Sequence, residues 1–182
     1  MPMVASAAEI VSFWLNAGPD RWFTKDAAFD EQIRERFLDT YETAAAGKLA
    51  GWEQSAQGAL ALLVLLDQLP RNMFRGDARA FATDPLARAI AAGAIIRGFD
   101  SQVAKELRGF FYLPFEHSED VADQERSVAF HKAIDDVDGL KWAEIHADII
   151  RRFGRFPHRN AVLGRTTTAE EQAFLDDGGF AG

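Results

Sequence analysis

The 182 residues contain no cysteine. This absence excludes thiolate nucleophiles, disulfides, iron–sulfur clusters and cysteine-bound zinc. It fits a reducing compartment, where proteins do without disulfides. Phosphate-binding loops are missing as well, because residues 47–51 begin and end in glycine but are not followed by the lysine and serine with which such a loop ends. We therefore expect no nucleotide-dependent transfer and no bound cofactor.

Long apolar runs are also lacking. The longest, residues 59–66, has eight residues, whereas a helix that crosses a membrane needs roughly 20. Residues 1–6 lack the basic start of a secretory signal. We expect a soluble, cytoplasmic protein that does not bind membranes.

Positive charge is scarce, and the net charge is −8. Since affinity for nucleic acid comes largely from clustered lysine and arginine, this balance argues against general nucleic-acid binding. Residues 149–168 depart from it, because they hold no acid but contain Arg151, Arg152, Arg155, Arg159 and Arg165. No linker rich in serine, glycine or charge divides the chain, so we expect one domain over residues 1–182.

Alternating strand patterns are lacking too, and helical spacing runs throughout the chain. Phe29, Ile33, Phe37 and Tyr41 form one apolar stripe. Residues 60–66 are apolar on every side, which predicts a central, buried helix. The pattern indicates an all-α fold of about seven to nine antiparallel helices with short connections.

Local signals predict several helix ends. The residue before a proline is pushed out of helical geometry, so the stripe that contains Phe111 is expected to end before Pro114. Ser118 or Asp120 can cap the following helix, which is expected to reach about Val137.

Two further groups of residues are given structural roles. Thr168 and Glu171 form a capping box for a short last helix. Packing between helices is expected of the aromatic residues Trp14, Trp22, Phe23 and Trp52.

Proline lies at the centre of three polar stretches, residues 68–72, 113–119 and 155–160. Each interrupts a helical pattern with side chains that can bind anions, metals or protons, and two of them end in Arg-Asn. We expect the functional site to form from these stretches.

These stretches carry a resemblance. Residues 65–72, 113–119 and 152–160, together with residues 11–14 and 22–26, resemble a widespread bacterial family of unknown function in the tetratricopeptide-like helical superfamily. The resemblance covers roughly residues 8–176, with Leu69 in place of an expected phenylalanine. It implies an all-helical, tetratricopeptide-like fold, but no established reaction and no catalytic residues.

The second stretch holds a base, a hydroxyl and a carboxylate in His117, Ser118 and Glu119. Neighbouring side chains point in different directions, so they form no ready nucleophilic triad. Helix capping accounts for Ser118 and Glu119. It does not account for His117, which is the better functional candidate.

The third stretch, residues 152–160, is the strongest constellation. Guanidinium groups present forked donors for carboxylate or phosphate, and His158 with Asn160 adds a titratable group and an amide. Arg152 and Asp148 have the spacing of a pair on one helix. The alternative to an anion site is a buried network that fixes helix packing, in which these arginines pair with acids such as Asp67, Glu119 and Asp148.

The two other histidines are assigned to structural positions. His146 lies on an apolar stripe, where a lone histidine is more often a satisfied core residue than a ligand. His131 is assigned to a solvated helix edge. Ligand pairs such as His-x-x-x-His or Glu-x-x-His are missing, so we expect no metal site.

Three hypotheses for function follow. The leading one is binding of a small anionic ligand or a peptide carboxylate in a pocket lined by Arg71, Asn72, His117, Arg155, His158, Arg159 and Asn160. The second is a hydrolase in which His117 or His158 is the general acid/base and the arginines stabilise developing negative charge. The third is a helical scaffold that binds a partner protein.

Overall fold

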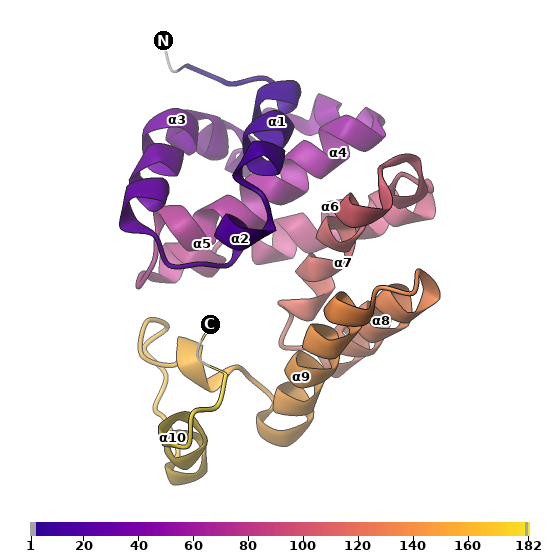
Figure 1. Ribbon diagram of the computed structural model, residues 1–182. Coiled ribbons are helices and arrows are strands. Elements are labelled where there is room, and N and C mark those ends of the chain that lie inside the picture. The colour runs from indigo at the N-terminus through magenta and orange to yellow at the C-terminus, as the bar shows by residue number, and fades with distance from the viewer. Residues whose placement is uncertain (1–2, 181) are drawn as a thin grey trace. The chain divides into compact units, whose positions relative to one another are not determined.

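The computed structural model describes residues 3–180 and 182. Over this part of the chain all regular elements are helical and there is no strand, which confirms the all-α prediction. Figure 1 shows α1 (Ala7–Ala17), α2 (Pro19–Trp22), α3 (Ala27–Ala45), α4 (Ala56–Leu63), α5 (Leu69–Met73), α6 (Asp84–Ile96), α7 (Gly109–Glu116), α8 (Val121–Ala133), α9 (Val137–Phe153) and α10 (Ala169–Asp176). None of these helices is long and apolar enough to cross a membrane.

The described residues form two compact units. The first runs to Arg75 and includes Arg79–Pro114, and the second comprises Gly76–Ala78 and Phe115–Gly182. The chain therefore crosses between the units after Arg75, after Ala78 and inside α7. The single domain expected from the lack of a linker stays a prediction.

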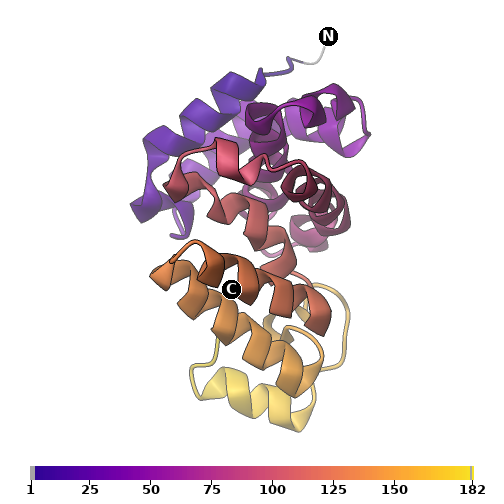
Figure 2. The ribbon, with the colours of Figure 1, turned by 90° about the vertical axis from the view of Figure 1, so that its right-hand side faces the viewer.

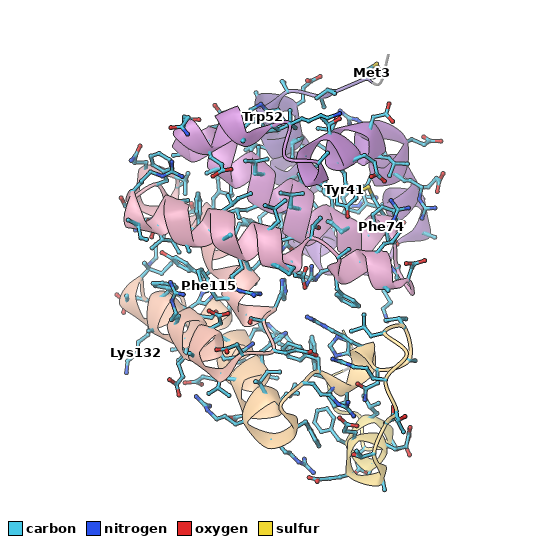
Figure 3. All side chains as sticks on the ribbon, turned by 180° about the vertical axis from the view of Figure 1, so that it is seen from behind. Met3, Tyr41, Trp52, Phe74, Phe115 and Lys132 are labelled. Carbon is cyan, nitrogen blue, oxygen red and sulfur yellow. The ribbon has the colours of Figure 1, made fainter. Side chains whose placement is uncertain are left out.

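The core of the first unit is the predicted central helix. Residues 58–70 are all buried, and each buried leucine contributes about 1.5–3 kcal/mol relative to an exposed one. Helices α1 and α6 pack on α4, and α3 packs on α5. The ring of Tyr41 on α3 meets that of Phe74, just after α5, with 5.3 Å between centroids (Figure 3).

A π-helical turn, Val64–Gln68, joins α4 to α5 without a break, so counting these as one rod leaves nine helices in the described chain. The backbone N–H of Leu69 bonds to the carbonyl of Val64, five residues back. The expectation that Pro70 interrupts the helix is therefore corrected. Pro70 has no N–H to offer the carbonyl of Leu66, and this carbonyl accepts a 2.6 Å bond from the hydroxyl of Thr83 instead.

Helix α7 corrects a second expectation. It continues through Pro114 and ends at Glu116, whereas the sequence indicated an end before the proline. Phe111 and Phe115 are fully buried. Burying two phenylalanines stabilises the helix by about 3–6 kcal/mol, which matches or exceeds the roughly 3 kcal/mol that an interior proline costs.

In the second unit α8 and α9 lie side by side (Figure 2). Of the two caps suggested by the sequence, Asp120 is the N-cap of α8. This helix ends at Ala133 instead of about Val137, because Asp135 takes a positive φ of 52° and Asp136 caps the next helix. The capping box predicted for α10 is present.

Candidate functional site

The first polar stretch forms a charged cluster in the first unit. Arg71 donates to both carboxylate oxygens of Asp84, at 3.0 Å each, and lies 3.7 Å from the carboxylate of Asp67. Burial opposes the charge of Arg71, but Asp67 and Asp84 outweigh it and raise the pKa of Arg71. Asn72 donates to the carboxylate of Asp30 at 2.8 Å. Both predicted ligand residues therefore bind acids of the protein itself.

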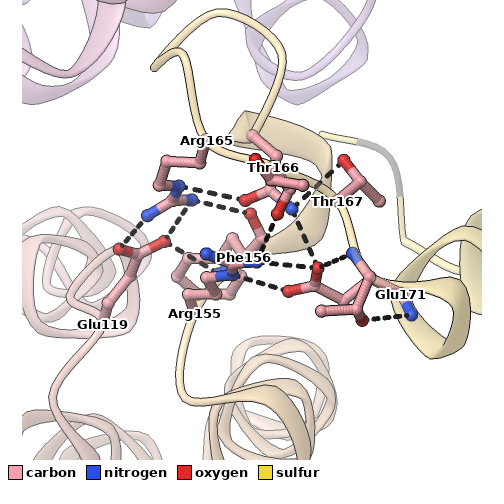
Figure 4. A network of polar contacts seen from close by, with 9 residues as sticks. Glu119, Arg155, Phe156, Arg165, Thr166, Thr167 and Glu171 are labelled. Atoms are coloured by element: carbon pink, nitrogen blue, oxygen red, sulfur yellow. Dashed lines mark hydrogen bonds and ion pairs between the residues drawn. The ribbon is translucent and has the colours of Figure 1, made fainter.

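The third stretch forms a larger network in the second unit, centred on Arg165 (Figure 4). Arg165 donates to the two oxygens of Glu119 at 2.7 and 3.0 Å, to the carbonyl of Phe156 at 3.1 Å and to the side-chain oxygen of Asn160 at 3.0 Å. Glu119 also accepts from the N–H of Phe156 at 2.8 Å. Burial acts to raise the pKa of Glu119, but these bonds hold it below its usual range.

Glu171 is the second carboxylate of this network. It accepts from Nε and Nη2 of Arg155 at 2.6 and 2.9 Å, from Asn160 at 3.2 Å and from the N–H of Thr168 at 2.8 Å. The bonds from Arg155 lower the pKa of Glu171 to about 2, against the opposing effect of burial. Arg155 and Asn160 thus hold the polypeptide around residues 155–171 together.

Of the three acids named for the structural alternative, Glu119 pairs with Arg165, which lies outside residues 152–160. The pair expected between Asp148 and Arg152 is wrong: Asp148 pairs with Arg151 at 2.9 Å, and Arg152 pairs with Glu170 of α10 at 3.0 Å. The spacing of residues along α9 does not indicate that Arg152 pairs with a residue of α10. Arg165 was missed as a site residue, although it stands in the window without acids.

All four histidines belong to the second unit. His146 Nδ1 lies 2.8 Å from the carbonyl of Trp142 and 3.2 Å from the carboxylate of Glu116, as befits a core histidine. His131 is only 2% exposed, so its assignment to a solvated edge is wrong. Its Nδ1 bonds to Asp136 at 2.8 Å, and burial lowers the pKa of His131 despite that carboxylate.

The remaining predicted site residues surround aromatic rings. The ring of His117 lies 6.4 Å from that of His146, and His158 lies 5.7 Å from the ring of Phe156. The buried guanidinium of Arg159 covers Phe156 at 4.5 Å. Among the residues the structure describes, no group of three or more histidines and acids is arranged to hold a metal ion.

Sequence reasoning missed a groove in the first unit. It has a volume of about 470 Å³ and lies between α1 and α3, with Arg21 of α2 at its side. Its two arginines and other polar residues form no recognisable sequence motif, because they come from different helices and meet only in the folded protein. Its polar lining comprises Glu9, Ser12, Asn16, Arg21, Gln32 and Arg36.

The guanidinium groups of both arginines in the groove lie over aromatic rings. The guanidinium carbon of Arg36 lies 4.7 Å from the ring centroid of Phe13, and that of Arg21 lies 4.3 Å from the centroid of Phe29. The two rings stack on each other, with 5.6 Å between centroids.

Of the aromatic residues predicted to pack between helices, Trp14 of α1 stacks on Trp22 of α2 with 5.9 Å between centroids. Phe23, which is 70% exposed, is the exception.

The charged side chains of the groove differ in how many hydrogen bonds they make. The carboxylate of Glu9 accepts from the N–H and the hydroxyl of Ser6, at 2.7 Å each, and these bonds lower the pKa of Glu9. Arg21 donates to Asp26 at 2.9 Å. Arg36 is exposed and makes no hydrogen bond or ion pair with the described residues, but its charge also contributes to lowering the pKa of Glu9. The arrangement offers guanidinium donors to a negatively charged group from outside.

Fold and sites define an all-helical protein with internally paired charge clusters and an open cationic groove. The chain belongs to the family described as bacterial protein of unknown function (DUF924), whose model matches residues 10–179. This confirms the bacterial family of unknown function that the motifs resemble.

A solved structure supports the same assignment. The chain is similar to a protein of unknown function, ATU0120 from Agrobacterium tumefaciens, with 53% identity and a TM-score of 0.91. The match covers 94% of this chain and 97% of the other. A search of curated proteins found no match.

Proposed function

We propose that this chain is a binding protein that holds a carboxylate, either a small acid or an acidic peptide side chain, in the groove between α1 and α3. The observation that carries the proposal is the exposed guanidinium of Arg36, which rests on the ring of Phe13 and makes no hydrogen bond or ion pair with an acid of the described residues. A guanidinium held on a ring has its donors set in place for a ligand and loses little freedom on binding.

Size and charge agree with this choice of ligand. The groove, at about 470 Å³, falls within the roughly 300–1,000 Å³ of small-molecule sites. Its lining holds two arginines and one acid, Glu9, whose Oε2 accepts both bonds from Ser6. A local excess of positive charge in a chain of net charge −8 favours an anionic ligand.

The motif residues predicted to bind a ligand favour the groove indirectly. Arg71, Asn72, Arg155 and Asn160 donate to carboxylates of the protein. A ligand at those positions would have to displace a bonded carboxylate, which leaves a buried charge without its partner and is strongly unfavourable. The groove requires no such exchange.

Two finer features belong to the same proposal. We place the fold in the tetratricopeptide-like superfamily, which the side-by-side pairing of α8 and α9 supports. We also propose a cytoplasmic location, supported by an acidic composition without cysteine.

Calorimetric titration tests carboxylate binding. The probes are succinate, citrate and a tetraglutamate peptide, with inorganic phosphate for comparison. Arg36→Gln removes the carrying group, and Arg97→Gln is the matched control, because Arg97 lies 4.9 Å from the ring of Phe99 outside the groove. Losing a charged hydrogen bond costs about 1.5–3 kcal/mol, so Arg36→Gln should weaken binding by about 10- to 100-fold.

The control variant should bind like the wild type. The proposal fails if none of the carboxylates binds the wild type, or if Arg36→Gln binds them as tightly as Arg97→Gln does.

A further inference from the structure

We infer that the groove recognises two carboxylates joined by an aromatic or aliphatic spacer, an inference that rests on the proposed carboxylate binding. The shared chemistry is a pair of anionic ends with a flat or apolar middle. Free dicarboxylic acids and peptides with two acidic side chains both present it.

The guanidinium groups of Arg36 and Arg21 lie over different aromatic rings of the groove. Arg36 lies over the rings of Phe13 and Phe37, and Arg21 lies over that of Phe29. Phe13, under Arg36, and Phe29, under Arg21, are separate rings whose centroids lie 5.6 Å apart. Each guanidinium therefore offers its own donors, and a ligand with two anionic ends can meet both.

Aromatic surface fills the space between the cations. Phe13 is half-buried, stacks on Phe29 at 5.6 Å and meets the edge of Phe37 at 4.9 Å. The rings of Phe13 and Phe29 thus form a continuous series with Arg36 at one end and Arg21 at the other. Phe29 is only 1% exposed, so Phe13 supplies the accessible aromatic surface. A spacer with aromatic or aliphatic carbon gains from contact with Phe13, and one with charge in its middle loses hydration there.

The two ends are unequal. Arg21 shares its charge with Asp26, at 2.9 Å, and Asp26 also caps α3 by accepting from the N–H groups of Ala28 and Phe29. Arg36 interacts with Glu9 through charge alone, without a hydrogen bond. We therefore expect Arg36 to contribute more to affinity than Arg21, with both required for the preference for dicarboxylates.

A nearby depression explains why the ligand is confined to this groove. It has a volume of about 320 Å³ and shares Arg36, but its lining also includes Glu31, Glu35 and Asp39. Three acids there repel a second anionic group. The cationic partner for the second carboxylate is on the side of Arg21.

A chain-length series tests the inference on the wild-type protein. Succinate, adipate, suberate, sebacate and terephthalate are titrated by calorimetry beside the monocarboxylates hexanoate and benzoate. A capped tetrapeptide with glutamate at both ends separates a peptide source from free acids. We expect affinity to peak at one spacer length, about tenfold or more above the matched monocarboxylate.

Variants assign the two ends. Arg21→Gln and Arg36→Gln should each reduce the best dicarboxylate to the affinity of a monocarboxylate or below, and Arg97→Gln should keep the peak. Arg21→Lys, which retains a charge near Asp26, guards against a general loss of α3 capping, and circular dichroism checks the fold of each variant.

The outcomes separate the two proposals. If monocarboxylates bind as tightly as every dicarboxylate and Arg21→Gln has no effect, the two-point inference is overturned while carboxylate binding stands. If no carboxylate binds the wild type at all, both are overturned.

Discussion

The carboxylate of Glu171 joins three parts of the second unit. It is the third residue of α10, where it bonds back to the N–H of Thr168, and it also accepts from Arg155 and Asn160. It is only 2% exposed. A carboxylate with this many donors is much more stable ionised than protonated, which is why its pKa falls to about 2.

The acid dependence of stability follows from that pKa. The folded-state pKa of Glu171 lies below its ordinary value of 4.5, so the unfolded chain binds the proton more tightly. The stabilisation is fully present above about pH 4.5 and is lost as the pH falls toward about 2. We predict that Glu171→Gln costs about 2–3 kcal/mol at pH 7, and that the difference from the wild type narrows below pH 4.5.

Urea unfolding at pH 7, 4.5 and 3 measures this difference. Glu170→Gln is the control, because Glu170 pairs with Arg152 at the surface and exposed pairs contribute about 0–1 kcal/mol. A Glu171→Gln penalty that stays constant from pH 7 to pH 3 would contradict the assignment of the low pKa.

Sequence alone gave part of this arrangement. The capping box of Thr168 and Glu171 was predictable because both residues lie within one helical turn. Arg155 is 16 residues from Glu171, and Arg165 is 46 residues from Glu119. Their pairing depends on the path of the chain after α9, which no local spacing encodes.

Among the elements, the rod formed by α4, the π turn and α5 shows how a proline is accommodated in a buried helix. Pro70 leaves the carbonyl of Leu66 without its usual donor four residues on. Thr83, which precedes α6, supplies a hydroxyl at 2.6 Å in its place. The missing backbone bond is thus replaced by a side chain from the next part of the chain.

Removing that hydroxyl should leave a buried carbonyl without a partner. We predict that Thr83→Val costs about 1–3 kcal/mol, measured by urea unfolding. Pro70→Ala adds a backbone N–H, so the double variant should recover part of the loss. Thr43→Val is the control, because the hydroxyl of Thr43 bonds to an exposed carbonyl, that of Asp39, and water can replace it.

An equal loss in Thr83→Val and Thr43→Val would show that the buried carbonyl does not depend on Thr83. Additive losses in the double variant with Pro70→Ala would show that proline is not the reason for the bond.

Helix ends were predictable where a local cap decides them, as at Asp120 and Thr168. The predictions failed at Pro70 and Pro114, where burial and a distant hydroxyl compensate for the missing N–H. They also failed near Val137, where Asp135 adopts a positive φ. Each failure has a tertiary or backbone cause that apolar spacing does not contain.

For the whole molecule, composition and periodicity predicted the all-α class and the buried central helix. They placed the functional site in the proline motifs, where the structure shows arginines and amides bonded to internal acids. The groove between α1 and α3 could not be predicted from the sequence. Its two arginines occupy ordinary helical positions, and only the folded protein places them over the stacked rings of Phe13 and Phe29. Charge pairing within the chain therefore decides which arginines are left for a ligand.

The cooperativity of unfolding tests the expectation of one domain. Thr83 belongs to the first unit and Glu171 to the second, and the chain passes from one unit to the other inside α7 without a linker. We predict one calorimetric transition in which Thr83→Val and Glu171→Gln each lower the single midpoint. A loss of 1 kcal/mol shifts the midpoint of a chain of this size by about 2–4 °C.

Scanning calorimetry at pH 7 distinguishes the alternatives. In a single domain the calorimetric and van't Hoff enthalpies agree, and both variants move the whole curve. If the units unfold separately, Thr83→Val moves one part of the curve and Glu171→Gln the other, since each destabilises only the unit that contains it. That outcome would replace one domain with two, and one of the joins between them would lie within α7, a helix that was expected to end before Pro114.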